Sequence, residues 1–144
     1  MIVSEMLASA LRMGVPVLLA ALGAIFSERS GVVNIGLEGM MIVGAFWGAF
    51  GSYMSGPSMG VLMAIAAGAT LALVHAVVCV TFRVNQVVSG VALNILAYGV
   101  TRFASISIFK MATTSPHVDR FATIDVPVLS QIPLLGPIFA GLSP

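Results

Sequence analysis

The feature that most constrains this chain is a 24-residue stretch, Met59–Phe82, without a single Asp, Glu, Lys or Arg. About 20 consecutive apolar residues are enough for a helix to cross the hydrocarbon layer of a membrane. No water reaches the backbone inside that layer, so a spanning segment satisfies its own hydrogen bonds, most simply as a helix. The stretch therefore predicts a transmembrane helix.

The composition of the whole chain agrees with a membrane location. Apolar residues make up 59% of the 144 residues and charged residues only 8%, whereas an ordinary soluble domain has about 25% charged residues. The net charge is +1, and no Lys/Arg cluster suited to nucleic-acid phosphates is present. The single cysteine, Cys79, excludes an internal disulfide.

Four membrane spans are predicted from the apolar pattern, which makes the fold an all-α, polytopic transmembrane helical bundle. The run Met13–Phe26 follows Arg12 in the manner of a signal peptide, but it lacks a small-x-small cleavage site and further apolar runs follow it. We therefore expect it to be retained as part of the first span. The predicted spans are about residues 8–26, 38–54, 59–82 and 87–109.

The last part of the chain differs in character. Residues 110–133 contain three prolines and four charged residues, which predicts a long extramembrane loop. Residues 134–144 become apolar again but are too few to cross a membrane. We expect them to be the start of a further span, and the chain to be the N-terminal half of a longer protein.

Small residues recur at every fourth position of the second and third spans. Such ladders allow two helix backbones to approach closely in lipid, where close packing and not water drives association. They predict helix packing and say nothing about function. The glycines expected at these contacts are Gly36, Gly44, Gly48, Gly60 and Gly68.

A polar stripe runs along the fourth span, where Gln86, Asn94, Tyr98 and Arg102 recur at intervals of four or eight residues. Unsatisfied polar groups are costly in hydrocarbon, so the stripe must face protein or water. Two interpretations remain open. Either the side chains bond neighbouring helices, with Arg102 reaching a lipid headgroup, or they line a hydrated path.

His75 and Cys79 lie one helical turn apart in the third span. Two ligand-type side chains do not make a metal site, so no metal site is predicted. A histidine within a membrane span more often bonds a neighbouring helix.

The polar stretch between the first two spans, about residues 27–38, predicts a break in the helical pattern. Ser30 and Gly31 interrupt helical continuity, and Asn34 and Glu38 add polar groups where the next helix begins. The apolar residues 32–35 are unusual for a surface loop and suggest that the segment returns among the helices. Discontinuous membrane helices often expose such backbone to a substrate cavity. An ordinary connecting loop is the alternative.

Three motifs resemble one protein family. The sequence FSERSGVVNIGLEGMM at residues 26–41 is similar to the signature of permease subunits of bacterial ABC importers, of the nucleoside and simple-sugar type within the branched-chain amino acid and ribose permease family. The sequences VNQVVSGVALN at residues 84–94 and IPLLG at residues 132–136 resemble later motifs of that group.

The resemblance implies a partial transmembrane permease domain over residues 1–144 in the bacterial cytoplasmic (inner) membrane. It implies transport of a nucleoside or simple sugar, and as partners a second homologous permease, two cytoplasmic ATPase subunits and an extracytoplasmic substrate-binding lipoprotein. No GxxxxGK[ST] phosphate loop is present, so ATP and Mg²⁺ are expected on the ATPase subunits and this chain is not expected to be an enzyme. The residues expected to line or shape the translocation path are Asn34, Glu38, Gln86, Asn94 and Tyr98.

Two questions stay open at this stage. A membrane scaffold or assembly subunit that transports nothing is the alternative function, because the small-residue ladders suffice for it. The positive charges on the two sides are too evenly divided to fix the orientation, and similarity to sugar permeases favours an external loop at residues 110–133.

Overall fold

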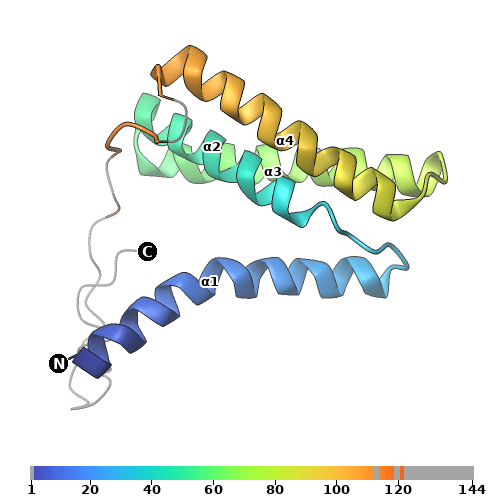
Figure 1. Cartoon of the computed structure of the whole chain (residues 1–144), viewed down its shortest axis with the longest axis horizontal. Coiled ribbons are helices and arrows are strands. Elements are labelled where there is room, and N and C mark those ends of the chain that lie inside the picture. Colours follow the sequence, from blue (N-terminus) through green and yellow to red (C-terminus); the bar gives the residue numbers. More distant parts are fainter. Residues whose placement is uncertain (1, 112–113, 119–120, 122–144) are drawn as a thin grey trace. The chain divides into compact units, whose positions relative to one another are not determined.

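The computed structural model describes residues 2–111, 114–118 and 121, and its regular elements are all helices (Figure 1). This confirms the prediction of an all-α fold. The predicted loop at 110–133 lies largely, and the predicted span start at 134–144 entirely, outside the described residues. The helices are α1 (Ile2–Arg29), α2 (Leu37–Ser55), α3 (Pro57–Ala76), the π-helix η1 (Val77–Thr81) and α4 (Gln86–Phe109).

Three of the helical segments described are long and apolar enough to cross a membrane: Ser9–Arg29, Pro57–Thr81 and Gln86–Phe109. The second predicted span corresponds to α2, which is not among them. Glu38 and four glycines lower the mean hydropathy of this 19-residue helix. The chain also divides into two compact units. The part of α1 up to Leu22 belongs to the first unit, and Gly23–Asp119 forms the second.

The helices α2 and α3 form an antiparallel pair joined by one residue, Gly56, whose φ of 90° is readily adopted only by glycine. Pro57 then occupies the start of α3, a position at which its missing N–H costs nothing. The two helices pack along their lengths (Figure 1). A tight reversal of this kind places the two small-residue ladders opposite each other.

Glycines bring the α2 and α3 backbones into direct contact. A Cβ atom added to Gly60 would collide with the Ser52 hydroxyl and lie 2.7 Å from the carbonyl oxygen of Gly48. Added to Gly48, it would lie 3.3 Å from the Cβ of Ala64. A Cβ added to Gly44 or Gly68 would lie farther from its nearest neighbouring atom, at 3.5 Å and 3.8 Å respectively. The contact is therefore tightest near the Gly56 turn.

The helix α4 packs on the other side of α2 and on the residues just before it. Gly36, which the sequence pattern grouped with the α2 ladder, lies against α4: a Cβ added to it would be 3.5 Å from the Cα of Gly90. A Cβ added to Gly90 would lie only 2.8 Å from the backbone nitrogen of Gly36 and 3.0 Å from the Cβ of Ile35. Gly36 and Gly90 thus form a second backbone contact.

Replacing Gly90 by alanine is expected to destabilise the protein, whereas the same change at Gly99 is not. An added methyl at position 90 has no room and forces displacement costing about 1–3 kcal/mol. Gly99 is on the same helix with nothing within 4 Å of its added Cβ, so Gly99→Ala isolates the general effect of the substitution. Thermal unfolding in detergent micelles measures both, and equal melting temperatures for the two variants would contradict the contact.

A buried polar pair joins α3 to α4. The Nδ1 atom of His75 lies 3.0 Å from the hydroxyl oxygen of Ser89, and both residues are buried. The sulfur of Cys79 lies 3.7 Å from the same nitrogen. The histidine therefore bonds a neighbouring helix. Between the two helices the chain reverses through Arg83, which has a φ of 54°.

Candidate functional site

The helix α1 ends in a defined turn. Gly31 has a φ of 86°, and the backbone nitrogen of Val32 donates to the carbonyl oxygen of Ser27 at 3.1 Å, the closing bond of a glycine-terminated helix. The Ser27 hydroxyl in turn donates to the carbonyl oxygen of Val32 at 2.7 Å. Ser27–Arg29 is therefore the last turn of α1, and the predicted break at 27–38 is shorter than expected. The non-helical residues are 30–36, called the linking segment here.

The side chain of Gln86 bonds the first part of the linking segment. Its Oε1 atom accepts from the backbone nitrogen of Val33 at 2.6 Å, and its Nε2 atom donates to the carbonyl oxygen of Gly31 at 3.2 Å. The carboxamide thus pairs with one donor and one acceptor, as a peptide group of a neighbouring strand would. Non-helical backbone at membrane depth needs such partners.

The side chain of Asn94, two helical turns along α4, does the same for the end of the linking segment. Its Nδ2 atom donates to the carbonyl oxygen of Ile35 at 3.1 Å, and its Oδ1 atom accepts from the backbone nitrogen of Gly39 at 2.8 Å. That nitrogen lies in the first turn of α2, where the N–H groups have no partner within the helix. Asn94 therefore fixes both the segment and the start of α2.

Asn34 stabilises the linking segment from within. Its Oδ1 atom accepts from the backbone nitrogen of Gly36 at 3.0 Å, a turn typical of asparagine, and its Nδ2 atom lies 3.5 Å from the sulfur of Met40. The same side chain lines a cavity of about 320 Å³ between the end of α1, the linking segment and α3. His75 and Ser27 line this cavity as well.

Glu38 and Tyr98 meet one turn further along. The Tyr98 hydroxyl donates to the Oε1 atom of Glu38 at 2.8 Å, and both side chains are exposed. Glu38 also lies in the first turn of α2, where the helix dipole favours a negative charge. The Tyr98–Glu38 pair is more exposed than the side chains of Gln86 and Asn94, which bond the linking segment and the start of α2.

The five residues predicted for the path thus gather along one face of α4 and the chain opposite it. Asn34 and Glu38 come from the linking segment and the start of α2, and Gln86, Asn94 and Tyr98 come from α4. Sequence reasoning did not assign Asn85, whose Oδ1 accepts from the backbone nitrogens of Val87 (2.9 Å) and Val88 (3.3 Å). Asparagine directly before a helical pattern was the available signal.

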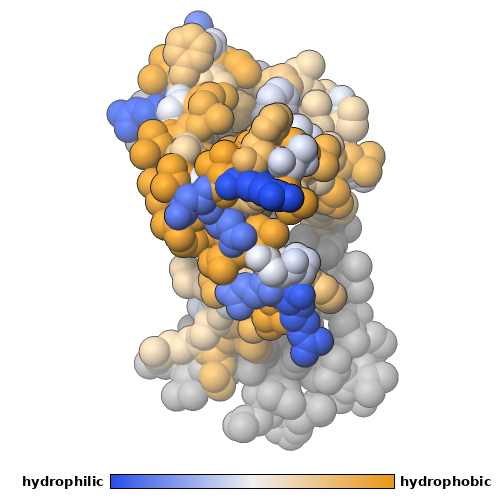
Figure 2. Space-filling view, turned by 90° about the vertical axis from the view of Figure 1, so that its right-hand side faces the viewer, coloured by the Kyte–Doolittle hydropathy of each residue, from blue (hydrophilic) through white to orange (hydrophobic). Residues whose placement is uncertain are grey.

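Charged side chains gather at the end of the second unit where α1 stops and α4 starts. Figure 2 looks at this end and shows hydrophilic groups set among apolar ones. The exposed residues there include Glu28, Arg29, Arg83 and Asn85. A cavity of about 490 Å³ lies beside Arg83 and Gln86. Lys110 follows the opposite end of α4.

Comparison with known proteins assigns the family. Residues 6–137 match the family described as branched-chain amino acid transport system / permease component. The chain belongs to this permease family. With three helices in the described part of the chain long and apolar enough to cross a membrane, it is a multi-pass membrane protein.

Several members of the permease family are similar to most of this chain. It is 47% identical over 131 residues to the guanosine ABC transporter permease protein NupQ of Bacillus subtilis (strain 168), a match covering 86% of this chain and 41% of the relative. It is 39% identical to the putative glucose ABC transporter permease protein TsgC13 of Haloferax volcanii (85% and 37%). It is 35% identical to the nucleoside ABC transporter permease protein NupC of Lactococcus lactis subsp. cremoris (86% and 41%).

The chain therefore spans about two fifths of the length of these curated permeases. No solved structure matches it.

Proposed function

We propose that this chain forms part of the membrane permease of an ABC importer for a nucleoside or a simple sugar, located in the cytoplasmic membrane. A sister permease, ATPase subunits that bind ATP and Mg²⁺, and a substrate-binding lipoprotein complete the importer. The observation that carries the proposal is the 47% identity to a guanosine permease over nearly the whole chain. The nucleoside and glucose permeases at 35% and 39% identity set the range of solutes.

The path residues have two roles in this proposal. Glu38 and Tyr98 border the translocation path with exposed side chains, and Asn34 borders it where the linking segment lines a cavity. Gln86 and Asn94 shape the path, because both ends of each carboxamide already bond the backbone around the linking segment. The first group acts on the solute and the second on the geometry of the segment.

The experiment is uptake of radiolabelled guanosine, adenosine, ribose and glucose in a bacterial strain that lacks its own nucleoside importers. The permease is expressed with the neighbouring ATPase, sister permease and lipoprotein genes. We expect uptake of at least one solute that depends on every subunit, and copurification of the ATPase with the tagged permease.

A scaffold subunit gives a different result. It leaves uptake unchanged when removed from the complex, and it need not bring down an ATPase. Uptake that persists without this chain would therefore overturn the proposed function, whichever solute is transported.

A further inference from the structure

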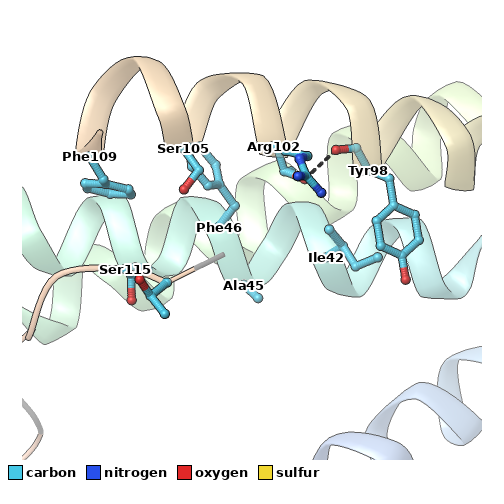
Figure 3. Close-up of a pocket in the computed structure, with 11 residues that line it drawn as sticks. Ile42, Ala45, Phe46, Tyr98, Arg102, Ser105, Phe109 and Ser115 are labelled. Atoms are coloured by element: carbon cyan, nitrogen blue, oxygen red, sulfur yellow. Dashed lines mark hydrogen bonds between the residues drawn. The ribbon is translucent and has the colours of Figure 1, made fainter. Parts of the chain in front are cut away.

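A third cavity, of about 410 Å³, lies between α2 and α4 beyond the Tyr98–Glu38 contact (Figure 3). Its volume is within the range of about 300–1,000 Å³ found for small-molecule sites. Figure 3 shows Tyr98 and Arg102 pointing from α4 toward α2, with Phe109 and Phe46 further along. Its lining residues include Phe46, Tyr98, Thr101, Arg102, Ser105 and Phe109.

The donors that α4 offers to this cavity come from Arg102. The hydroxyl groups that α4 presents there already donate to backbone: Thr101 donates to the carbonyl oxygen of Ala97 at 2.6 Å, and Ser105 donates to the carbonyl oxygen of Met111 at 2.7 Å. Tyr98 donates to Glu38. The guanidinium carries five N–H donors and no acceptor. Its position seven residues before the end of α4 places it about 10 Å inside the helix.

The wall of the cavity beyond Arg102 is apolar and is formed by two aromatic rings inclined to each other by 58°. The ring centroids of Phe46 and Phe109 lie 6.0 Å apart, and Phe109 is also held edge-on by Tyr53 at 5.7 Å. Phe46 is held in the same way by Trp47 at 5.8 Å. Rings supported on several sides in this way present fixed faces against which a planar group can stack.

The polar stripe of α4 therefore separates into two halves with different uses. The half that begins α4 is bonded to backbone through Gln86 and Asn94, so its amides are not available to a ligand. The half around Arg102 combines aromatic rings with guanidinium donors that bond no residue in the described part of the chain. A charged side chain inside a membrane span is costly and marks a functional position.

We propose that this cavity contacts the transported solute, with Arg102 donating to two adjacent acceptors on the edge of a flat heterocycle that packs against Phe46 or Phe109. The proposal rests on the proposed function. An arginine fork matches neighbouring oxygen and nitrogen acceptors, such as O6 and N7 of an oxopurine, whereas adenine presents an amino donor in place of the oxygen. The cavity thus favours guanosine and inosine over adenosine.

The test is initial uptake by the permease with its partner subunits in proteoliposomes, measured for guanosine, inosine and adenosine. Arg102→Gln removes the charge and the fork, and Arg102→Lys keeps the charge alone. Arg12→Gln, an arginine change in the first unit, is the matched control. Melting temperatures of the purified complexes separate a loss of folding from a loss of recognition.

We expect Arg102→Gln to raise the KM for guanosine and inosine about tenfold, since a bidentate pair discriminates by about 1–3 kcal/mol. We expect the KM of Arg102→Gln for adenosine to change less than twofold. The KM values of Arg102→Lys for guanosine and inosine lie between those of the wild type and Arg102→Gln, and the KM values of Arg12→Gln equal those of the wild type. Equal effects on all three solutes, or none, would overturn the proposal.

A lipid-anchoring role for Arg102 gives another pattern. Arg102→Lys then behaves as the wild type, and the effect of Arg102→Gln varies with the anionic lipid content of the vesicles, which also overturns the proposal. If the wild-type importer transports none of the nucleosides, the nucleoside arm of the proposed function fails and this inference fails with it. If nucleosides are transported and Arg102→Gln does not affect their uptake, the proposed function is supported and this inference is overturned.

Discussion

Replacing Gly60 by alanine is expected to separate α2 from α3 and to lower the free energy of unfolding by about 3 kcal/mol, the upper end of the usual cost of overpacking. The new methyl group meets the Ser52 hydroxyl and the carbonyl oxygen of Gly48 at 2.7 Å. Neither helix can retreat locally, because Gly56 joins them within a few residues. Thermal unfolding in detergent micelles measures the loss.

Two further variants make this prediction specific. Gly68→Ala places the same methyl group on the same helix with 3.8 Å to its nearest neighbour, the carbonyl oxygen of Met40, and is expected to be close to neutral. Combining Gly60→Ala with Ser52→Gly removes one of the two collisions and is expected to restore part of the stability. A Gly60→Ala protein as stable as Gly68→Ala would contradict the packing described.

Replacing Asn94 by leucine is the second change with a large expected effect. Leucine has a similar volume but leaves the Gly39 N–H and the Ile35 carbonyl without their side-chain partner. An unpaired buried group costs about 1–3 kcal/mol; Gly39 is buried, and the more exposed Ile35 carbonyl adds a smaller cost. We expect a lower melting temperature and loss of uptake together.

The control for Asn94→Leu is Asn85→Leu, the same chemical change at the start of the same helix. It removes the cap of α4 and costs about 1 kcal/mol, while the linking segment keeps its bonds to Asn94. Cysteine labelling at Val33 adds a local measurement. Labelling that becomes faster in Asn94→Leu but not in Asn85→Leu supports the positioning role, and equal labelling rates would rule it out.

The helices were predictable from the sequence because hydrophobic runs of this length have few alternatives. The stretch Met59–Phe82 corresponds to α3 followed by η1, and the switch to π-helical geometry after Ala76 had no sequence signal. The helix α2 was expected to be as apolar as the other spans. Its glycines allow close contact with the neighbouring helices, but they also lower its mean hydropathy.

The candidate site was predictable as a set of residues and not as an arrangement. Spacing along one helix showed that Gln86, Asn94 and Tyr98 share a face, but spacing cannot show what lies opposite that face. The partners of Gln86 and Asn94 are backbone atoms more than 50 residues away in sequence, and backbone atoms carry no residue-specific signal. For this reason the choice between bonding protein and lining a path stayed open.

The positive residues at both ends of α4 restrict how this helix can move. Arg83 precedes it and Lys110 follows it, so the 24-residue helix, about 36 Å long at 1.5 Å per residue, is bracketed by two cations. Sliding α4 along the bilayer normal drags one of them toward the hydrocarbon, at a cost that rises to about 3 kcal/mol at the centre. Tilting or rotating about the axis keeps both in contact with headgroups. In the transport cycle proposed above, α4 can therefore tilt or rotate, whereas a shift along the bilayer normal is penalised in either direction.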